Sequence, residues 1–200
     1  LPAIVEARVV IPRGDPERGE LDRALEGISR DGGQDWGHLL GQAWTKADFH
    51  KVFPFSPALV QVLVELSNYL QRERTGIRVL MEMLKDYLDD YQLGDVVPLG
   101  DLYDVLAAGQ APLDGHVRAR FDLAKRLYRD ELLRLIRQRH GTESRERCQL
   151  MRDEHPIRIG CANCPMVECR TDNQLVKTLL LAELVPNIAV LRDLTASRLV

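Results

Sequence analysis

The chain has 200 residues, of which 45% are hydrophobic and 28% are charged, and its net charge is −3. This is the composition of an ordinary globular protein, and it excludes a fibrous or a disordered chain. No apolar run reaches the roughly 18 residues of a membrane-spanning helix, and the first residues lack the features of a signal peptide. We therefore expect a cytoplasmic protein. Because the chain starts without methionine and stops abruptly, we also expect a piece of a longer protein.

Charge is distributed unevenly along the chain. Residues 1–116 carry 11 Lys and Arg against 19 Asp and Glu, residues 117–147 carry 10 against 5, and residues 148–200 carry 6 of each. A basic stretch inside an acidic protein binds polyanions or docks against the acidic part of its own chain. The sequence alone leaves both interpretations open.

Hydrophobic periodicity predicts helices separated by clear breaks in the N-terminal quarter. A break over residues 12–16 contains two prolines and precedes a predicted helix over residues 20–29. The apolar residues between positions 36 and 44 predict a second, short helix.

The next two predicted helices have stronger signals. Ser56 suits an N-cap and Pro57 the first helical position, where its missing N–H costs nothing. A leucine stripe follows, consisting of Leu59, Leu63, Leu66 and Leu70. After a polar turn over residues 71–76, apolar residues at i, i+3, i+4 and i+7 predict an amphipathic helix over residues 77–88.

The second half of the chain contains the longest predicted helix. A short helix is predicted over residues 101–107, a linker over 110–115, and a long helix from about 116 to 139 that a glycine C-cap at Gly141 ends. The predicted buried stripe of the long helix comprises Val117, Phe121, Ala124, Tyr128, Leu132, Leu135 and Ile136. A final helix is expected from about Asp172 to Pro186. Because no stretch alternates with period two, we predict an all-α fold.

All four cysteines lie within the polar stretch that we predict over residues 142–170, namely Cys148, Cys161, Cys164 and Cys169. Such clustering in a chain without a secretory signal favours metal binding over disulfides. The Cys-x2-Cys spacing brings two thiolates to one tetrahedral ion, and the flanking cysteines complete four ligands. We predict a structural zinc site, with an iron–sulfur cluster or unligated thiols as alternatives. His155 is a further potential ligand, although a surface position explains it more simply.

Arg72, Arg74 and Arg78 surround the start of the helix predicted over residues 77–88. Guanidinium groups match phosphate oxygens, and the positive end of a helix dipole attracts anions. The alternative is that these arginines are solvated and paired with Glu73 or Glu82.

Basic side chains off the apolar stripe of the long helix form a weaker candidate site, for nucleic acid. They are Arg118, Lys125, Arg126, Arg129, Arg134 and Arg137. The sequence contains no phosphate-binding loop of the form G-x4-GK-[ST], no G-x-S-x-G and no HE-x2-H motif. We therefore expect no catalytic activity from this chain alone.

Four stretches carry a resemblance to known proteins. They are FPFSPAL at residues 53–59, LQRERTGIRVL at 70–80, VVPLGDLYDVL at 96–106 and TDNQLVKTLL at 171–180. In them the sequence resembles the large bacterial P-loop ATPases of phage-defence islands, of the phage-exclusion and phage-growth-limitation type. The resemblance covers most of residues 50–200.

The resemblance implies a helical lid that follows a nucleotide-binding core. Arg74 then resembles the sensor-2 arginine of AAA+-type ATPases, with Arg78 and Arg72 as further choices. Residues 1–52 become a helical segment that continues from the core, residues 53–115 a lid-like subdomain, and residues 116–200 the long basic helix, cysteine loop and C-terminal helices. The core itself lies outside the chain, so ATP is expected only in the full-length protein.

The function implied is therefore nucleotide sensing by the lid region of a phage-resistance ATPase. Its expected partners are other domains of the parent, other defence-system proteins and DNA, with no membrane contact. Two alternatives stay open, a zinc-containing nucleic-acid-binding module and a structural scaffold of a defence complex.

Overall fold

The computed structural model describes residues 14–31, 45–66, 75–87, 92–107, 115–142 and 166–184, together with Leu191. Most of these residues are helical, which confirms the all-α prediction. Their one β-type contact is an isolated parallel bridge between Phe55 and Val97. None of the described helices is both long and apolar enough to span a membrane.

The first two described helices are α2, Asp15–Asp31, and α4, Lys46–Val52. Helix α2 begins before the predicted residue 20 because Pro16 lies in its first turn, where a missing N–H is tolerated. Helix α4 was not predicted. A capping box starts it, in which Thr45 Oγ1 accepts from the Asp48 N–H at 3.2 Å and the Asp48 carboxylate accepts from the Thr45 N–H at 3.1 Å.

Helices α5, Pro57–Leu66, and α6, Thr75–Tyr87, follow. Ser56 Oγ accepts a hydrogen bond from the Leu59 N–H at 3.2 Å, which confirms the predicted N-cap. Helix α6 includes Thr75 and Gly76, which the sequence pattern places in the preceding turn. The short helix predicted over residues 36–44 lies outside the described residues.

The remaining helices are α7, Leu99–Ala107; α8, Gly115–Leu127; η2, Tyr128–Leu132; α9, Leu133–His140; and α11, Val167–Leu184. Helices α8, η2 and α9 form the long helix that the periodicity predicts. Gly141 ends it with a left-handed φ of 61°, as expected of a glycine C-cap. Helix α11 starts before the predicted Asp172, so Cys169 lies on a helix and not in a polar loop.

The middle of the long helix, η2, is a π-helical turn that the sequence pattern did not reveal. A π turn inserts one extra residue and rotates everything after it. In an uninterrupted α-helix Leu135 would lie on the buried face with Phe121 and Tyr128, as we predicted. Instead Leu135 is 51% exposed, and Ile136 and the ring of His140 are buried.

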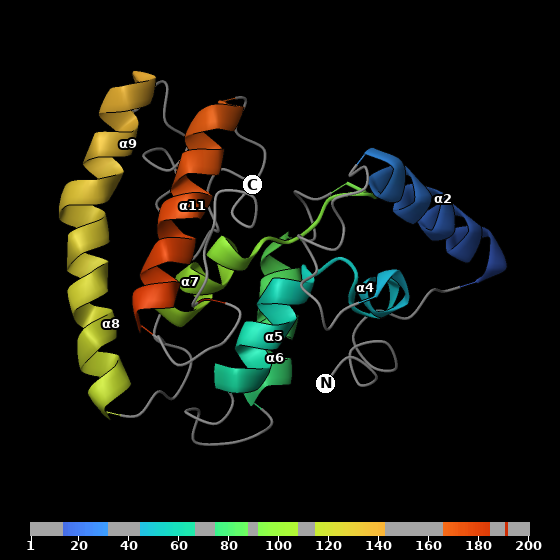
Figure 1. The fold of residues 1–200 in the computed structure, drawn as a ribbon, viewed down its shortest axis with the longest axis horizontal. Coiled ribbons are helices and arrows are strands. Elements are labelled where there is room, and N and C mark those ends of the chain that lie inside the picture. The colour runs from blue at the N-terminus through green and yellow to red at the C-terminus, as the bar shows by residue number, and fades with distance from the viewer. Residues whose placement is uncertain are drawn as a thin grey trace.

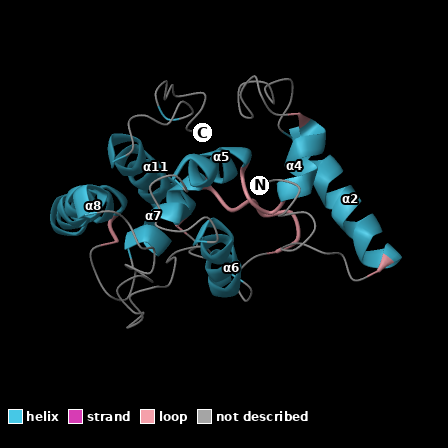
Figure 2. Ribbon diagram, turned by 90° about the horizontal axis from the view of Figure 1, so that it is seen from below, coloured by secondary structure: helices cyan, strands magenta, loops and turns pink. Residues whose placement is uncertain are grey.

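The helices pack around one cluster of buried apolar side chains with contributions from α2 to α11. The long helix α8–η2–α9 and α2 lie at opposite ends of the molecule, with α11, α7, α5 and α6 between them (Figure 1). A second view gives the same order (Figure 2). Helices α7 and α11 approach closely at Gly100 of α7, where an added Cβ would lie 2.4 Å from the backbone oxygen of Gln174 on α11.

Candidate functional site

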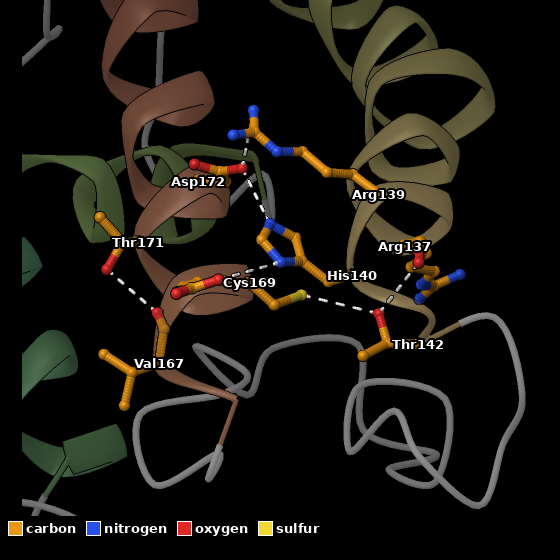
Figure 3. A network of polar contacts seen from close by, with 9 residues as sticks. Arg137, Arg139, His140, Thr142, Val167, Cys169, Thr171 and Asp172 are labelled. Carbon is orange, nitrogen blue, oxygen red and sulfur yellow. Dashed lines mark hydrogen bonds and ion pairs between the residues drawn. The ribbon is translucent and has the colours of Figure 1, made fainter.

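Polar side chains join the end of α9 to the beginning of α11 (Figure 3). The Nε2 atom of His140 lies 2.9 Å from Asp172 Oδ2, and Nη1 of Arg139 lies 3.4 Å from the same oxygen. The other ring nitrogen of His140, Nδ1, lies 4.0 Å from the exposed carboxylate of Glu168. The His140 ring is buried, and hydrogen bonds between buried groups require fixed geometry. These contacts therefore hold α9 and α11 in one register.

Thr142 and Cys169 are in contact close to the His140–Asp172 pair. Thr142 Oγ1 lies 3.6 Å from Cys169 Sγ, and both residues are buried. The backbone N–H of Thr142 donates to the Arg137 carbonyl at 2.9 Å, which fixes the chain just after Gly141. The segment between Thr142 and α11 carries the other three cysteines. Thr142, the last described residue before this segment, therefore lies beside the thiol of Cys169, in the helix that follows it.

Of the four predicted metal ligands, the structure describes only Cys169. Cys148, Cys161 and Cys164 lie outside the described residues, which on their own contain no group of three metal-ligating side chains. Cys169 is in the first turn of α11, where the positive end of the helix dipole stabilises a thiolate. Its position therefore fits a ligand, with Thr142 Oγ1 able to donate a hydrogen bond to the sulfur.

A second polar cluster lies deeper between α7 and α11. Lys177 Nζ contacts Asp104 Oδ2 at 2.5 Å and lies 5.5 Å from the centre of the Tyr128 ring. Burial alone would lower the pKa of Lys177, but the Asp104 carboxylate outweighs that effect and holds the pKa above its ordinary value. Lys177 is therefore a buried cation with a specific partner on a neighbouring helix.

Aromatic residues surround this ion pair. The Tyr128 hydroxyl donates to Asn173 Oδ1 at 2.5 Å, and Tyr103 stacks on Phe121 with ring centroids 5.6 Å apart. The Tyr103 hydroxyl is buried and has no hydrogen-bond partner among the described residues, and burial raises its pKa. It therefore stays protonated and contributes mainly through its ring.

Of the three predicted nucleotide-sensing arginines, the structure describes Arg78, near the start of α6. Arg78 is on the surface, and its Nε lies 2.8 Å from Glu82 Oε1 one turn along the same helix. This pairing was the alternative interpretation of that arginine. An exposed pair of this kind contributes only about 0.5 kcal/mol, so the guanidinium remains accessible to another anion. Arg72 and Arg74 lie outside the described residues.

The predicted nucleic-acid-binding residues are partly engaged along their own helix. Lys125 lies 3.7 Å from Asp122, Arg129 2.8 Å from Asp130, and Arg134 3.0 Å from Glu131, measured between charged atoms. The other three predicted positions are Arg118, Arg126 and Arg137. Arg118 and Arg126 are exposed, whereas Arg137 is half-buried. Binding of nucleic acid by this helix stays a prediction.

Sequence reasoning missed the polar residues that join the helices. Lys177 did carry a signal, because it lies at helical spacing from Asn173, Leu180 and Leu184 on the buried face of α11. A charged residue on such a face predicts a buried partner. His140 carried no such signal, since only the π turn brings it to the interior.

The architecture defines an all-α domain in which polar contacts join a long basic helix to α11. Residues 2–200 match the family model described as "BREX System ATPase PglY protein 2nd domain". The chain therefore belongs to this family and is a region of a phage-defence ATPase, which confirms the resemblance found in its sequence motifs. No solved structure matches the chain.

Proposed function

We propose that this domain senses the nucleotide bound by the core of its parent ATPase. Arg74, Arg78 and Arg72 would face the phosphate groups, in the manner of a helical lid. The observation that carries the proposal is the placement of Arg78. It lies in the first turns of a 13-residue helix, with its side chain 70% exposed and paired only weakly, to Glu82.

Physical chemistry supports this placement. The first N–H groups of a helix and its dipole favour an anion near the N-terminus, and a guanidinium adds charge and forked donors. Among the described residues the partner of the Arg78 guanidinium is Glu82 on the same helix, and a phosphate could replace it at little cost. The neighbouring core would supply the nucleotide.

The test uses the intact parent ATPase with Arg74→Ala and Arg78→Ala, and with Lys85→Ala as a matched control. Lys85 is an exposed cation in the last turn of the same helix, at the end that repels anions. We expect each arginine variant to lose at least about tenfold in nucleotide affinity or turnover, as for the loss of a charged hydrogen bond. The control should stay within about twofold. Unchanged kinetics in both arginine variants would reject the sensor role.

We further propose that Cys148, Cys161, Cys164 and Cys169 hold one structural zinc ion. The supporting observation is that Thr142, the last described residue before the segment that carries the first three, lies beside the buried thiol of Cys169. Four protein ligands close the coordination shell, so the ion would stabilise this segment and leave no position for substrate. An iron–sulfur cluster with the same ligands is the alternative.

Elemental analysis of the purified protein tests this proposal. We expect about one equivalent of zinc, its loss in Cys169→Ser, and a lower melting temperature after chelation. Thr142→Ala is the matched control, because it changes the neighbour of the thiol and leaves all four cysteines in place. Iron with absorption in the visible range would indicate the cluster instead. Less than about half an equivalent of either metal would exclude a four-cysteine site.

A further inference from the structure

The π turn in the long helix leaves two ways of placing the residues that follow it. Its defining hydrogen bond runs from the Leu133 N–H to the Tyr128 carbonyl, five residues back. In a regular α-helix that carbonyl would accept from the N–H of Leu132 instead. Loss of the π turn would therefore rotate α9 by about 100° and move it about 1.5 Å along its axis, the increment of one residue. We call the observed arrangement the π register and the other the α register.

The sequence after the turn contains a replacement for each of the two residues that the π register buries, Ile136 and His140. Ile136 is 6% exposed and Leu135 is 51% exposed, and the α register exchanges them. Leucine and isoleucine have nearly the same volume, so this exchange leaves the buried apolar area almost unchanged. One turn later, Arg139 precedes His140 in the same way.

Asp172 on α11 keeps a hydrogen-bond donor in either register. His140 Nε2 lies 2.9 Å from Asp172 Oδ2, and Arg139 Nη1 lies 3.4 Å from the same oxygen (Figure 3). Rotation to the α register withdraws the His140 ring and moves Arg139 toward the place that the ring leaves. The carboxylate is therefore not left without a partner, which would be the main cost of breaking this contact.

The first half of the long helix stays in place during such a rotation, because Tyr128 is anchored. Its hydroxyl donates to Asn173 Oδ1 at 2.5 Å, and Lys177 Nζ lies 5.5 Å from the centre of its ring. The rotation therefore begins after Tyr128. At the other end Thr142 moves with α9, away from the Cys169 sulfur that lies 3.6 Å from its hydroxyl in the π register.

We propose that residues 133–140 form a two-register switch. In the π register His140 is buried and Thr142 covers the Cys169 thiol, whereas in the α register both withdraw and Leu135 is buried. One sequence can act as a switch when its two packings differ little in free energy, and the exchanges described above keep that difference small. A state of the cysteine-bearing segment that draws Thr142 away selects the α register. The switch requires neither a bound nucleotide nor a metal ion.

Substitution of Ile136 tests the switch in the whole 200-residue chain. Ile136→Gln disfavours the π register, which buries position 136, and leaves the α register intact. The measurement is the broadening of leucine methyl NMR signals by a soluble gadolinium chelate. Leu127 and Leu181 are internal standards, because they are 46% and 0% exposed. The Leu135 methyls should broaden like those of Leu127 in the unchanged chain, and as little as those of Leu181 in Ile136→Gln.

A matched background removes the alternative register. Deletion of Asp130, an exposed residue within the π turn, restores a regular α-helix and leaves the residues on both sides in their observed orientation. We expect Ile136→Gln to lower the melting temperature by at most about 3 °C in the unchanged chain, and by at least about 6 °C in the deletion background. Leu135→Gln should change it by less than about 2 °C in both, because Leu135 is exposed in the π register.

His140→Ala provides a second way to favour the α register. It removes the buried ring and leaves Arg139 as the donor to Asp172, so the Leu135 methyls should again become protected from the chelate. Arg139→Ala is the matched control, because it removes the replacement donor, and Leu135 should stay accessible in it.

Three outcomes would overturn the proposal. One is that Leu135 stays as accessible as Leu127 in folded Ile136→Gln and His140→Ala. Another is an equal loss in melting temperature from Ile136→Gln with and without Asp130, which would make the π turn a fixed feature of the helix. The third is failure of Ile136→Gln to fold in the unchanged chain, since Leu135 should take over the buried position.

Discussion

The two halves of the core bury different kinds of side chain. Around α4, α5 and α6 the buried residues are apolar, such as Phe49, Leu63 and Leu80. In the described part of the chain the buried polar residues all belong to the other half, around α7, the end of α9 and α11. They are Asp101, Thr142, Asn173 and Lys177.

The difference teaches how each half specifies its packing. Apolar contacts are non-directional, so α5 and α6 gain stability from area and close fit. A buried cation has one acceptable position relative to its carboxylate, because displacement leaves both without partners. In the polar half, Lys177 and His140 thus fix the register of α11 against α7 and α9, in addition to any stability they contribute.

The largest expected effect comes from breaking the buried ion pair. Lys177→Met leaves the Asp104 carboxylate without its cation, and we expect a loss of about 3–5 kcal/mol in the free energy of unfolding. Adding Asp104→Leu removes the orphaned charge and should restore most of this loss. Urea unfolding of the single and double variants measures both changes.

The apolar half supplies the contrast. Leu63→Ala should cost a similar 2–5 kcal/mol or so through loss of burial and a cavity. Removing a charged side chain from a neighbouring helix should not restore the stability lost in Leu63→Ala, in contrast to the effect of Asp104→Leu on Lys177→Met. If the losses in the free energy of unfolding from Lys177→Met and Asp104→Leu were additive in the double variant, the two residues would not be coupled. The claim that their pairing fixes the register of α11 would then fail.

The next effect concerns close approach of helices. Gly100→Ala places a Cβ 2.4 Å from the Gln174 oxygen, which is backbone and cannot rotate away. We expect a loss of about 1–3 kcal/mol as α7 and α11 separate.

Gly76→Ala is the control in the apolar half, where the new Cβ would lie 3.7 Å from Leu63 in ordinary contact. It should be neutral or stabilise the protein by up to about 1 kcal/mol, because alanine is the better helix former. Thermal melts of the two variants decide the comparison. Equal changes in melting temperature for Gly100→Ala and Gly76→Ala would mean that α7 and α11 are packed no more tightly at Gly100 than α5 and α6 are at Gly76.

The smallest effect belongs to the junction of α9 and α11. Asp172→Ala removes the acceptor next to the buried His140 ring and should cost about 1–2 kcal/mol. Asp122→Ala, which removes an exposed i,i+3 pair with Lys125, should stay within about 0.5 kcal/mol. Chemical unfolding of both variants measures the difference. A cost for Asp172→Ala no larger than that for Asp122→Ala would show that the junction is only a surface contact.

Much of the fold was predictable because its signals are local. The Ser56 cap, Pro57 at the first position of α5, the amphipathic spacing of α6 and the Gly141 cap each depend on residues within one or two turns. The same holds for the motifs behind the family resemblance. Helix starts at Asp15 and Val167 were missed because proline in a first turn and polar early residues weaken the pattern.

The candidate sites were less predictable, because they depend on distant contacts. Residue types and spacing suffice to nominate Cys169 and Arg78. They do not reveal that Thr142 lies against the Cys169 thiol, or that Lys177 pairs with a carboxylate 73 residues away. Such pairs exist only after the helices have packed.

The sequence by itself determined that the chain is helical, where most of its helices lie and which family it belongs to, since these follow from periodicity, capping and short motifs. Only the tertiary structure decided the register of the long helix. Its π turn buries His140 and exposes Leu135, and this exchange is favourable because α11 provides Asp172 to receive the buried ring. Local pattern cannot encode that choice, since the compensating contact comes from another helix.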